Sequence, residues 1–309
     1  MVQKRHRLLA LALILLLMFG AATASAVESF RENTAPVAEN LEINTYRGVS
    51  VGGRLSAVDP EGDTLRFTVT TAPTKGELEI SEDGRFVYTP ADGKKGKDYF
   101  GYKAMDGDGN HSQEATVIIR IQKQKSDVRY TDTAGLATDY AAHALVESGA
   151  LVGQYLGGQY VFEPDREMTR GEFLSLCMDI AGVKPLSGVR STGFSDDSAI
   201  PGWIKPYVST ALLTGAIAGY AGEAGATFVS DASVSQSEAA VILNRVMQIS
   251  DVSGSSAWTS DTVPIWAAQA VSNLAACSVI YPAGTSFSDG LTRAEAADML
   301  VRAMALLEK

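Results

Sequence analysis

The sequence predicts a multidomain fold in which an all-β sandwich is followed by an all-α unit of three helical repeats. Three observations predict it. Short segments of alternating apolar and polar residues fill residues 34–122. From residue 130 onward the composition shifts to Ala, Leu, Ser and Gly with helical periodicity. A Thr-Arg-x-Glu sequence precedes an amphipathic helix at residues 169–172 and again at residues 292–295. A degenerate copy, Ser-Gln-Ser-Glu, lies at residues 235–238.

The segments of the first half have the length and spacing of strands in a β-sandwich. Examples are LRFTVTT, GELEIS, GRFVYTP and ATVIIRIQ, which are separated by turns rich in Asp and Gly. The stretch from APVAENLEI to YKAMDGDGN resembles the bacterial cadherin-like, immunoglobulin-like domains of large surface proteins. The resemblance implies that residues 34–122 form one cadherin-like/Ig-like sandwich.

The first 26 residues have the three-part pattern of a secretory signal peptide. Lys4, Arg5 and Arg7 precede an apolar run at residues 8–19, and small residues at positions 24 and 26 suit cleavage before Val27. The run is shorter than the roughly 20 residues of a comfortable bilayer span. The sequence therefore predicts a secreted protein with no membrane contact after signal cleavage.

After a linker at residues 123–129, a helical unit recurs at residues 130–184, 191–250 and 257–309. Each unit has an Asp-bearing lead-in, a first helix, a Gly-rich loop that leads to a Phe, and a second helix. A Ser or Thr stands at the N-cap of that second helix, and a Glu three residues later completes a capping box. The pairs are Thr169 with Glu172, Ser235 with Glu238, and Thr292 with Glu295.

Capping does not explain the arginines of these motifs. Arg170 and Arg293 lie in the first helical turn, next to the positive end of the helix dipole, where a cation is disfavoured by up to ~1 kcal/mol. Each therefore needs an anionic partner. A bound carboxylate or phosphate satisfies this need, since helix N-termini and forked guanidinium groups both bind anions. An intramolecular salt bridge, for example to a lead-in Asp, is the alternative.

The second half resembles the S-layer homology (SLH) domain over residues 130–309. The resemblance implies three repeats that close into a pseudo-trimeric helical spindle. It also implies that grooves between repeats bind pyruvylated secondary cell-wall polysaccharide. In such grooves an arginine of the capped motif pairs with the pyruvate carboxylate, while an Asp, a Trp and a Gly complete the sugar contacts. Carried over to this chain, the set is Arg170, Arg293, Asp132, Asp196, Asp261, Trp203, Trp266, Gly149 and Gly215.

No single repeat carries the whole set. The first has Ala137 where the aromatic belongs, the second has Gln236 in place of the arginine, and the third has Ser278 in place of the glycine. Other interpretations of the set stay open. The two tryptophans could pack between repeats, and Gly149 and Gly215 could serve only as helix C-caps.

Other chemistry has little support in the sequence. The formal net charge of −10 disfavours nucleic acid as a partner. Cys177 and Cys277 lie on apolar helical stretches, where free thiols or a disulfide are both consistent. Asp179, Glu147 and Asp298 are expected on solvent-facing sides of helices. The turns of the first half offer a Ca²⁺ site, although such residues also build hairpin turns without metal; its candidate ligands are Asp59, Glu61, Asp63, Asp106 and Asp108.

The sequence therefore predicts a secreted, non-enzymatic and monomeric surface protein. Its SLH repeats anchor it non-covalently to an anionic wall polysaccharide and display the β-sandwich. The alternative is an adhesin or surface-assembly subunit, in which the cadherin-like domain binds protein or carbohydrate and the helical half is only structural.

Overall fold

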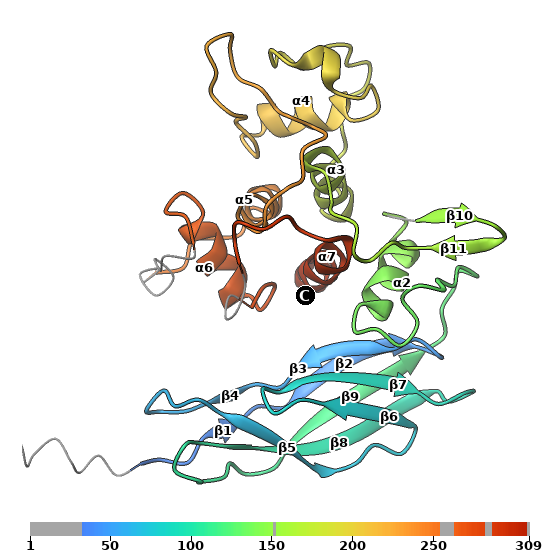
Figure 1. The fold of residues 1–309 in the computed structure, drawn as a ribbon, viewed down its shortest axis with the longest axis vertical. Helices are drawn as coiled ribbons and strands as arrows, with labels where there is room; N and C mark the ends of the chain where they lie inside the picture. Colours follow the sequence, from blue (N-terminus) through green and yellow to red (C-terminus); the bar gives the residue numbers. More distant parts are fainter. Residues whose placement is uncertain (1–32, 151–152, 254–262, 282–285, 308–309) are drawn as a thin grey trace, which may run out of the picture.

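The computed structural model describes residues 33–150, 153–253, 263–281 and 286–307. A β-region at one end of the molecule is followed by a group of helices at the other (Figure 1). The predicted signal peptide and Asp261 lie outside the described residues. No helix within the described part of the chain has the length and apolar character needed to cross a bilayer.

The β-region is a sandwich of two main sheets with strand orders β2-β9-β8-β5 and β3-β7-β6, and β1 pairs separately with β4. Neighbouring strands are antiparallel, apart from β2 and β9, which run parallel. The strands are β1 (Val37–Ala38), β2 (Leu41–Tyr46), β3 (Val51–Arg54), β4 (Ala57–Val58), β5 (Arg66–Thr71), β6 (Gly76–Ile80), β7 (Arg85–Pro90), β8 (Gly96–Met105) and β9 (Ala115–Gln122).

Strict alternation along β9 shows why these residues form a sandwich. Ala115, Val117, Ile119 and Ile121 are buried, and the residues between them are more exposed. Because side chains alternate across a strand, this pattern directs one face of the sheet into the core. The core also contains Phe67, Phe86, Tyr88, Phe100 and Tyr102.

One carboxylate is buried in the sandwich. Asp98 is 2% exposed and accepts hydrogen bonds from the backbone N–H groups of Thr74 (3.0 Å) and Lys75 (2.8 Å) and from the hydroxyl of Tyr88 (2.8 Å). Desolvation acts to raise the pKa of Asp98, but these hydrogen bonds outweigh it and hold the pKa below its usual value. Asp98 thus connects β8 to β7 and to the loop before β6.

In the second half, α3, α5 and α7 lie side by side and are viewed almost end-on, with α2, α4 and α6 around them (Figure 1). Their buried apolar stripes form one core that includes Phe173, Leu174, Leu243 and Leu300. The elements are α2 (Asp139–Ser148), β10 (Gln154–Leu156), β11 (Gln159–Val161), α3 (Arg170–Ile180), the short 3-10 helix η1 (Asp197–Ala199), α4 (Lys205–Leu213), α5 (Gln236–Met247), α6 (Ala268–Ala276) and α7 (Arg293–Leu307).

The prediction that this half is an all-α pseudo-trimeric spindle is wrong. It contains the antiparallel hairpin of β10 and β11 and long irregular connections between its helices. The local sequence QYLGGQYV explains the hairpin. The short segments QYL and QYV flank Gly157 and Gly158, and both glycines adopt positive φ angles (57° and 89°), as a two-residue hairpin turn requires. The repeat pattern of the sequence predicts only a Gly-rich loop here.

The two halves are joined by more than the chain connection. The backbone N–H of Gly52 in β3 donates to the carbonyl of Ala137 (2.9 Å), and the N–H of Tyr140 donates to the carbonyl of Ser50 (2.9 Å). Asp139 accepts from the N–H of Ser50 (3.1 Å). The start of α2 therefore covers the edge of β3, which would otherwise expose unpaired backbone groups.

Ala137 of the first repeat, which stands where the resemblance expects an aromatic residue, lies against β3. A Cβ atom built on Gly52 would lie 2.5 Å from the Cβ of Ala137, so the close approach of the two segments requires a glycine at position 52. The segment predicted as a linker is also held in place, because Glu147 accepts hydrogen bonds from the backbone N–H groups of Lys125 (3.0 Å) and Ser126 (2.6 Å).

Candidate ligand-binding site

The three capping boxes lie at the start of α3, α5 and α7. In each box the hydroxyl of the first residue accepts from the backbone N–H of the Glu, at 3.2, 3.3 and 3.2 Å, and the Glu carboxylate accepts from the N–H of the first residue, at 3.1, 2.9 and 2.9 Å. The free amides of each first turn are therefore partly satisfied inside the protein. The residues are Thr169, Glu172, Ser235, Glu238, Thr292 and Glu295.

The residue after each cap reaches toward the next repeat. Arg170 Nη1 lies 3.3 Å from Glu238 Oε1, in the capping box of α5. Gln236 Nε2 donates to Glu295 Oε1 (3.0 Å), in the capping box of α7. The same pattern would pair Arg293 with Glu172 of α3. These contacts link the starts of the three central helices.

Arg170 is fully partnered within the protein. It is buried, donates from Nε to the carbonyl of Phe228 (3.1 Å), and lies 4.7 Å over the ring of Tyr220. Its anionic partner is Glu238, not a lead-in aspartate. The internal salt bridge, the second of the two alternatives raised by the sequence, therefore accounts for Arg170.

Arg293 differs from Arg170 because its expected partner is already occupied. Arg166 Nη2 donates to Glu172 Oε1 (2.9 Å), which leaves Arg293 with a long contact from Nη1 to Glu163 Oε2 (3.5 Å) and a position 4.9 Å over the ring of Phe162. Within the described residues, Arg293 Nε and Nη2 and Arg166 Nε have no hydrogen-bond acceptor. Burying such donors unpaired costs on the order of 1–3 kcal/mol per group.

Arg293 lies among both cations and carboxylates. Its side chain is 4% exposed, and burial lowers its pKa from the ordinary value. The positive charge of Arg166 lowers this pKa further, whereas the charges of Glu163 and Glu172 act in the opposite direction. Two guanidinium groups thus share the same small space. A carboxylate bound there would accept hydrogen bonds and reduce the repulsion between the two cations.

A cavity of about 410 Å³ adjoins these arginines. It brings Arg293 of the third repeat together with Trp203 of the second, and its wall is completed from the first repeat. Trp203 is 59% exposed, so its indole face is available to a ligand. We call this space the Arg293 cavity; it is lined by Ala150, Gly153, Gln154, Arg166, Met168, Glu172, Ser175, Leu176, Asp179, Trp203, Tyr207 and Arg293.

Sequence reasoning missed several of these residues. Arg166 lies three residues before the Thr169 cap, in a stretch whose conformation no periodic pattern describes. Asp179 was expected to face solvent and is exposed, but it also lines the cavity and accepts a hydrogen bond from the hydroxyl of Tyr207 (3.0 Å). Partial desolvation raises the pKa of Asp179. The one available signal was the surplus of charged residues in PDREMTRGE.

The lead-in aspartates hold turns of the backbone. Asp132 accepts from the N–H groups of Phe162 (2.9 Å) and Glu163 (2.6 Å), and Asp196 accepts from those of Phe228 (2.9 Å) and Val229 (2.8 Å). Glu163 and Val229 both have positive φ angles, of 58° and 55°. Since non-glycine residues seldom adopt such a φ, and β-branched residues such as Val229 least of all, each Asp stabilises a strained turn, and in the structure its carboxylate is committed to that task.

The glycines of the predicted set lie at left-handed positions after helices. Gly149 (φ 78°) caps α2 and Gly215 (φ 76°) follows α4, and a Cβ at either site would meet no atom within 4 Å. Ser278 lies at the same point after α6 with a φ of 58°. The third repeat thus keeps this backbone conformation without a glycine, and C-capping accounts for all three positions.

Replacing Ser278 by glycine is expected to raise the free energy of unfolding by about 1 kcal/mol, because a side chain disfavours the left-handed region. The measurement is chemical denaturation of both proteins. The matched control is Gly215→Ala, for which a decrease of similar size is expected. A less stable Ser278→Gly protein would show that the serine side chain contributes more than its backbone strain costs.

Trp266 lies apart from the Arg293 cavity. It is as exposed as Trp203, at 59%, and stands just before α6. Neither tryptophan is buried between repeats, which was the alternative interpretation. Cys177 and Cys277 are both free thiols, and Cys177 is fully enclosed by the helical core.

The acidic turns of the sandwich are largely occupied by their own backbone. Asp59 Oδ1 accepts from the N–H groups of Glu61 (3.1 Å) and Asp63 (3.0 Å), and Asp106 Oδ1 accepts from that of Asp108 (3.0 Å). Desolvation and the charge of Asp59 raise the pKa of Asp63. The described residues contain no group of three or more His, Cys, Asp or Glu arranged to hold a metal ion. Calcium binding stays a prediction.

Comparison with known proteins finds a family match for the β-sandwich. Residues 33–123 match the family model described as a bacterial cadherin-like domain. No SLH match was found for the second half. None of the curated proteins matches the chain. A bacterial cadherin-like domain fits a role at the cell surface or in adhesion.

Solved structures share only part of the chain. Human protocadherin-24 EC1-2 is 17% identical over 30% of this chain and 54% of its own, with a TM-score of 0.25. A variant of the SrpA adhesin from Streptococcus sanguinis is 18% identical over 33% of this chain and 62% of its own, with a TM-score of 0.23. The endo-fucoidan hydrolase MfFcnA4 is 20% identical over 31% and 14%, with a TM-score of 0.25. The chain spans less than two thirds of each of these proteins.

Proposed function

We propose that this is a secreted, non-enzymatic surface protein that binds an anionic, pyruvylated cell-wall polysaccharide in the Arg293 cavity. Bound in this way, it would display its cadherin-like domain at the cell surface. The observation that carries the proposal is the pair of unpartnered, buried N–H groups of Arg293 next to Arg166, in a cavity that also exposes the ring of Trp203. A sugar that carries a carboxylate fits both features, since the guanidinium binds the carboxylate and the indole stacks on the sugar ring.

The number of sites follows from the same contacts. Arg170 is satisfied by Glu238 and the Phe228 carbonyl, and Gln236 replaces the arginine in the second repeat. Only Arg293, of these three residues after the caps, retains unpaired donors within the described structure. We therefore propose one anion-binding groove and not three.

Co-sedimentation of the full chain with purified cell-wall sacculi tests this function. The wild-type protein is expected to bind the sacculi. The affinity of Arg293→Gln is expected to be about tenfold or more weaker, because a charge-assisted hydrogen bond is worth about 1.5–3 kcal/mol. Trp203→Ala is expected to weaken binding as well. Trp266→Ala is the matched control, since this tryptophan is equally exposed but lies outside the cavity.

Chemical removal of the secondary polymer from the sacculi should abolish binding by the wild-type protein. Undiminished binding by Arg293→Gln, with the fold intact by circular dichroism, would contradict the proposal. That result favours the alternative function, an adhesin or surface-assembly subunit in which the cadherin-like domain at residues 33–123 makes the functional contact.

A further inference from the structure

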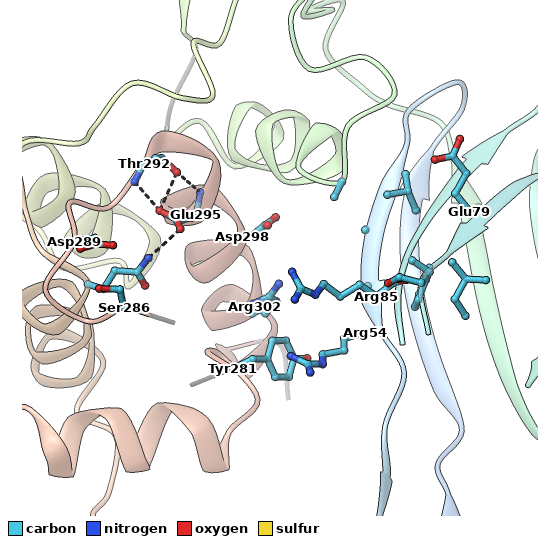
Figure 2. Close-up of a pocket in the computed structure, with 18 of the residues that line it drawn as sticks. Arg54, Glu79, Arg85, Tyr281, Ser286, Asp289, Thr292, Glu295, Asp298 and Arg302 are labelled. Carbon is cyan, nitrogen blue, oxygen red and sulfur yellow. Dashed lines mark hydrogen bonds between the residues drawn. The ribbon is translucent and has the colours of Figure 1, made fainter. Parts of the chain in front are cut away.

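A second, larger cavity lies between the two halves of the protein. It has a volume of about 1020 Å³ and is bounded on one side by β3 and β7 of the sandwich and on the other by α7. Figure 2 shows Arg54 and Arg85 extending from the sheet toward Arg302 and Tyr281 on the helical side. We call it the inter-module cleft. It shares no lining residue with the Arg293 cavity.

Arg54 and Arg85 form an unfavourable pair on the wall of the cleft. They are directly opposite each other in the antiparallel register of β3 and β7. Like charges at directly opposed positions destabilise a sheet. Arg85 Nε is held by Asp83 Oδ2 (2.7 Å), whereas the side chain of Arg54 has no hydrogen bond or ion pair with any described residue.

Arg302 brings a third cation from the opposite wall. Its Nη1 donates to the carbonyl of Val279 (3.3 Å), and its guanidinium lies 4.8 Å over the ring of Tyr281. No carboxylate of the described residues lies within salt-bridge distance of Arg302. Three guanidinium groups from three separate elements therefore converge on one space (Figure 2).

The cleft also contains acceptors, which restricts the kind of ligand. Four carboxylates also line it, together with the polar side chains of Gln236 and Ser286, and one of them, Asp298, is close enough to Arg302 for the two charges to interact. Their oxygens can accept hydrogen bonds from hydroxyl groups, which a sugar strand supplies and a polyglutamate peptide lacks. The carboxylates are those of Glu79, Asp289, Glu295 and Asp298.

We infer that the inter-module cleft binds an acidic polysaccharide strand whose carboxylates pair with Arg54, Arg85 and Arg302 and whose hydroxyl groups donate to the acidic side chains around them. The cleft is at the upper end of the ~300–1,000 Å³ of small-molecule sites, so it has room for more than one sugar unit. This site is separate from the proposed anchor site. Because its two walls belong to different halves of the protein, the affinity for the polysaccharide would depend on how the two halves are oriented.

Isothermal titration of the full chain with trigalacturonate, a carboxylate-bearing oligosaccharide, tests the inference. Arg54→Gln and Arg302→Gln are each expected to weaken binding about tenfold or more, since each removes a charge-assisted contact. Arg66→Gln is the matched control, because Arg66 is an exposed arginine of the same sandwich that lies outside the cleft. Its affinity should equal that of the wild type.

Three comparisons make the outcome decisive. The loss caused by Arg54→Gln should persist in an Arg293→Gln background, which separates this site from the Arg293 cavity. Neutral maltotriose and a hexaglutamate peptide should bind much more weakly than trigalacturonate. Thermal unfolding should show Arg54→Gln at least as stable as wild type, because the variant removes a repulsion. Absence of trigalacturonate binding, equal binding of either comparison ligand, or unchanged affinity in both cleft variants would overturn the inference.

Discussion

Replacing Asp98 by alanine is expected to lower the free energy of unfolding by about 3–5 kcal/mol, the range found when one partner of a buried charged network is removed. The carboxylate is almost fully enclosed and accepts from the N–H groups of Thr74 and Lys75 and from the hydroxyl of Tyr88. Without it, the buried hydroxyl of Tyr88 and the N–H groups of Thr74 and Lys75 lose their acceptor. Urea denaturation of both proteins measures the difference.

The pH dependence of this effect has a definite sign. Hydrogen bonds hold the pKa of folded Asp98 below its ordinary value of 3.8, so the folded state binds the proton less readily than the unfolded state. The stability that Asp98 contributes is present above about pH 4 and is lost as the pH falls through its folded pKa. Tyr88→Phe, which removes one donor only, should cost about 1 kcal/mol. Equal losses for Tyr88→Phe and Asp98→Ala would contradict the role assigned to the carboxylate.

Replacing Asp298 by asparagine is expected to stabilise the protein at pH 7 by up to about 3 kcal/mol, since one pKa unit corresponds to 1.36 kcal/mol. Desolvation raises the pKa of Asp298 to about 6, against the opposing influence of Arg302 and with added repulsion from Glu295. Above that pH the folded protein keeps a charge in a poorly solvated place. Asparagine preserves the shape of the side chain and removes the charge.

For Asp298 the sign is the reverse of that for Asp98. A carboxylate with a raised folded pKa favours the folded state below about pH 4 and loses this contribution as the pH rises to about 6. The advantage of Asp298→Asn should therefore vanish in thermal melts near pH 4 and grow up to about pH 7. Asp289→Asn is the control, because Asp289 also lines the cleft but is exposed to solvent. A constant advantage at all pH values would show that charge is not its cause.

Local patterns in the sequence predicted the elements that depend on near neighbours. Alternation along residues 115–122 indicated the strand β9, and the spacing of Thr169 and Glu172 indicated a capping box. Both depend on contacts a few residues apart, so the sequence displays them directly. The hairpin at Gly157 and Gly158 was equally local and was overlooked, because the repeat pattern suggested a loop.

The contacts of the candidate sites could not be predicted in the same way. Arg170 and Arg293 have the same motif, yet Arg170 meets Glu238 whereas Arg293 loses Glu172 to Arg166. That difference depends on which side chains meet between repeats. Arg54 and Arg302 are still further apart in the sequence, and only the docking of the sandwich on α2 brings them to one cleft.

The contact between β3 and α2 also decides how the molecule responds to mechanical load. A pull on the sandwich relative to the helical half reaches the backbone hydrogen bonds of Gly52 with Ala137 and of Tyr140 with Ser50, in addition to the covalent connection at residues 123–129. Glu147 clamps that connection at Lys125 and Ser126. Tension between the two halves would therefore have to rupture these hydrogen bonds before the chain between them could extend.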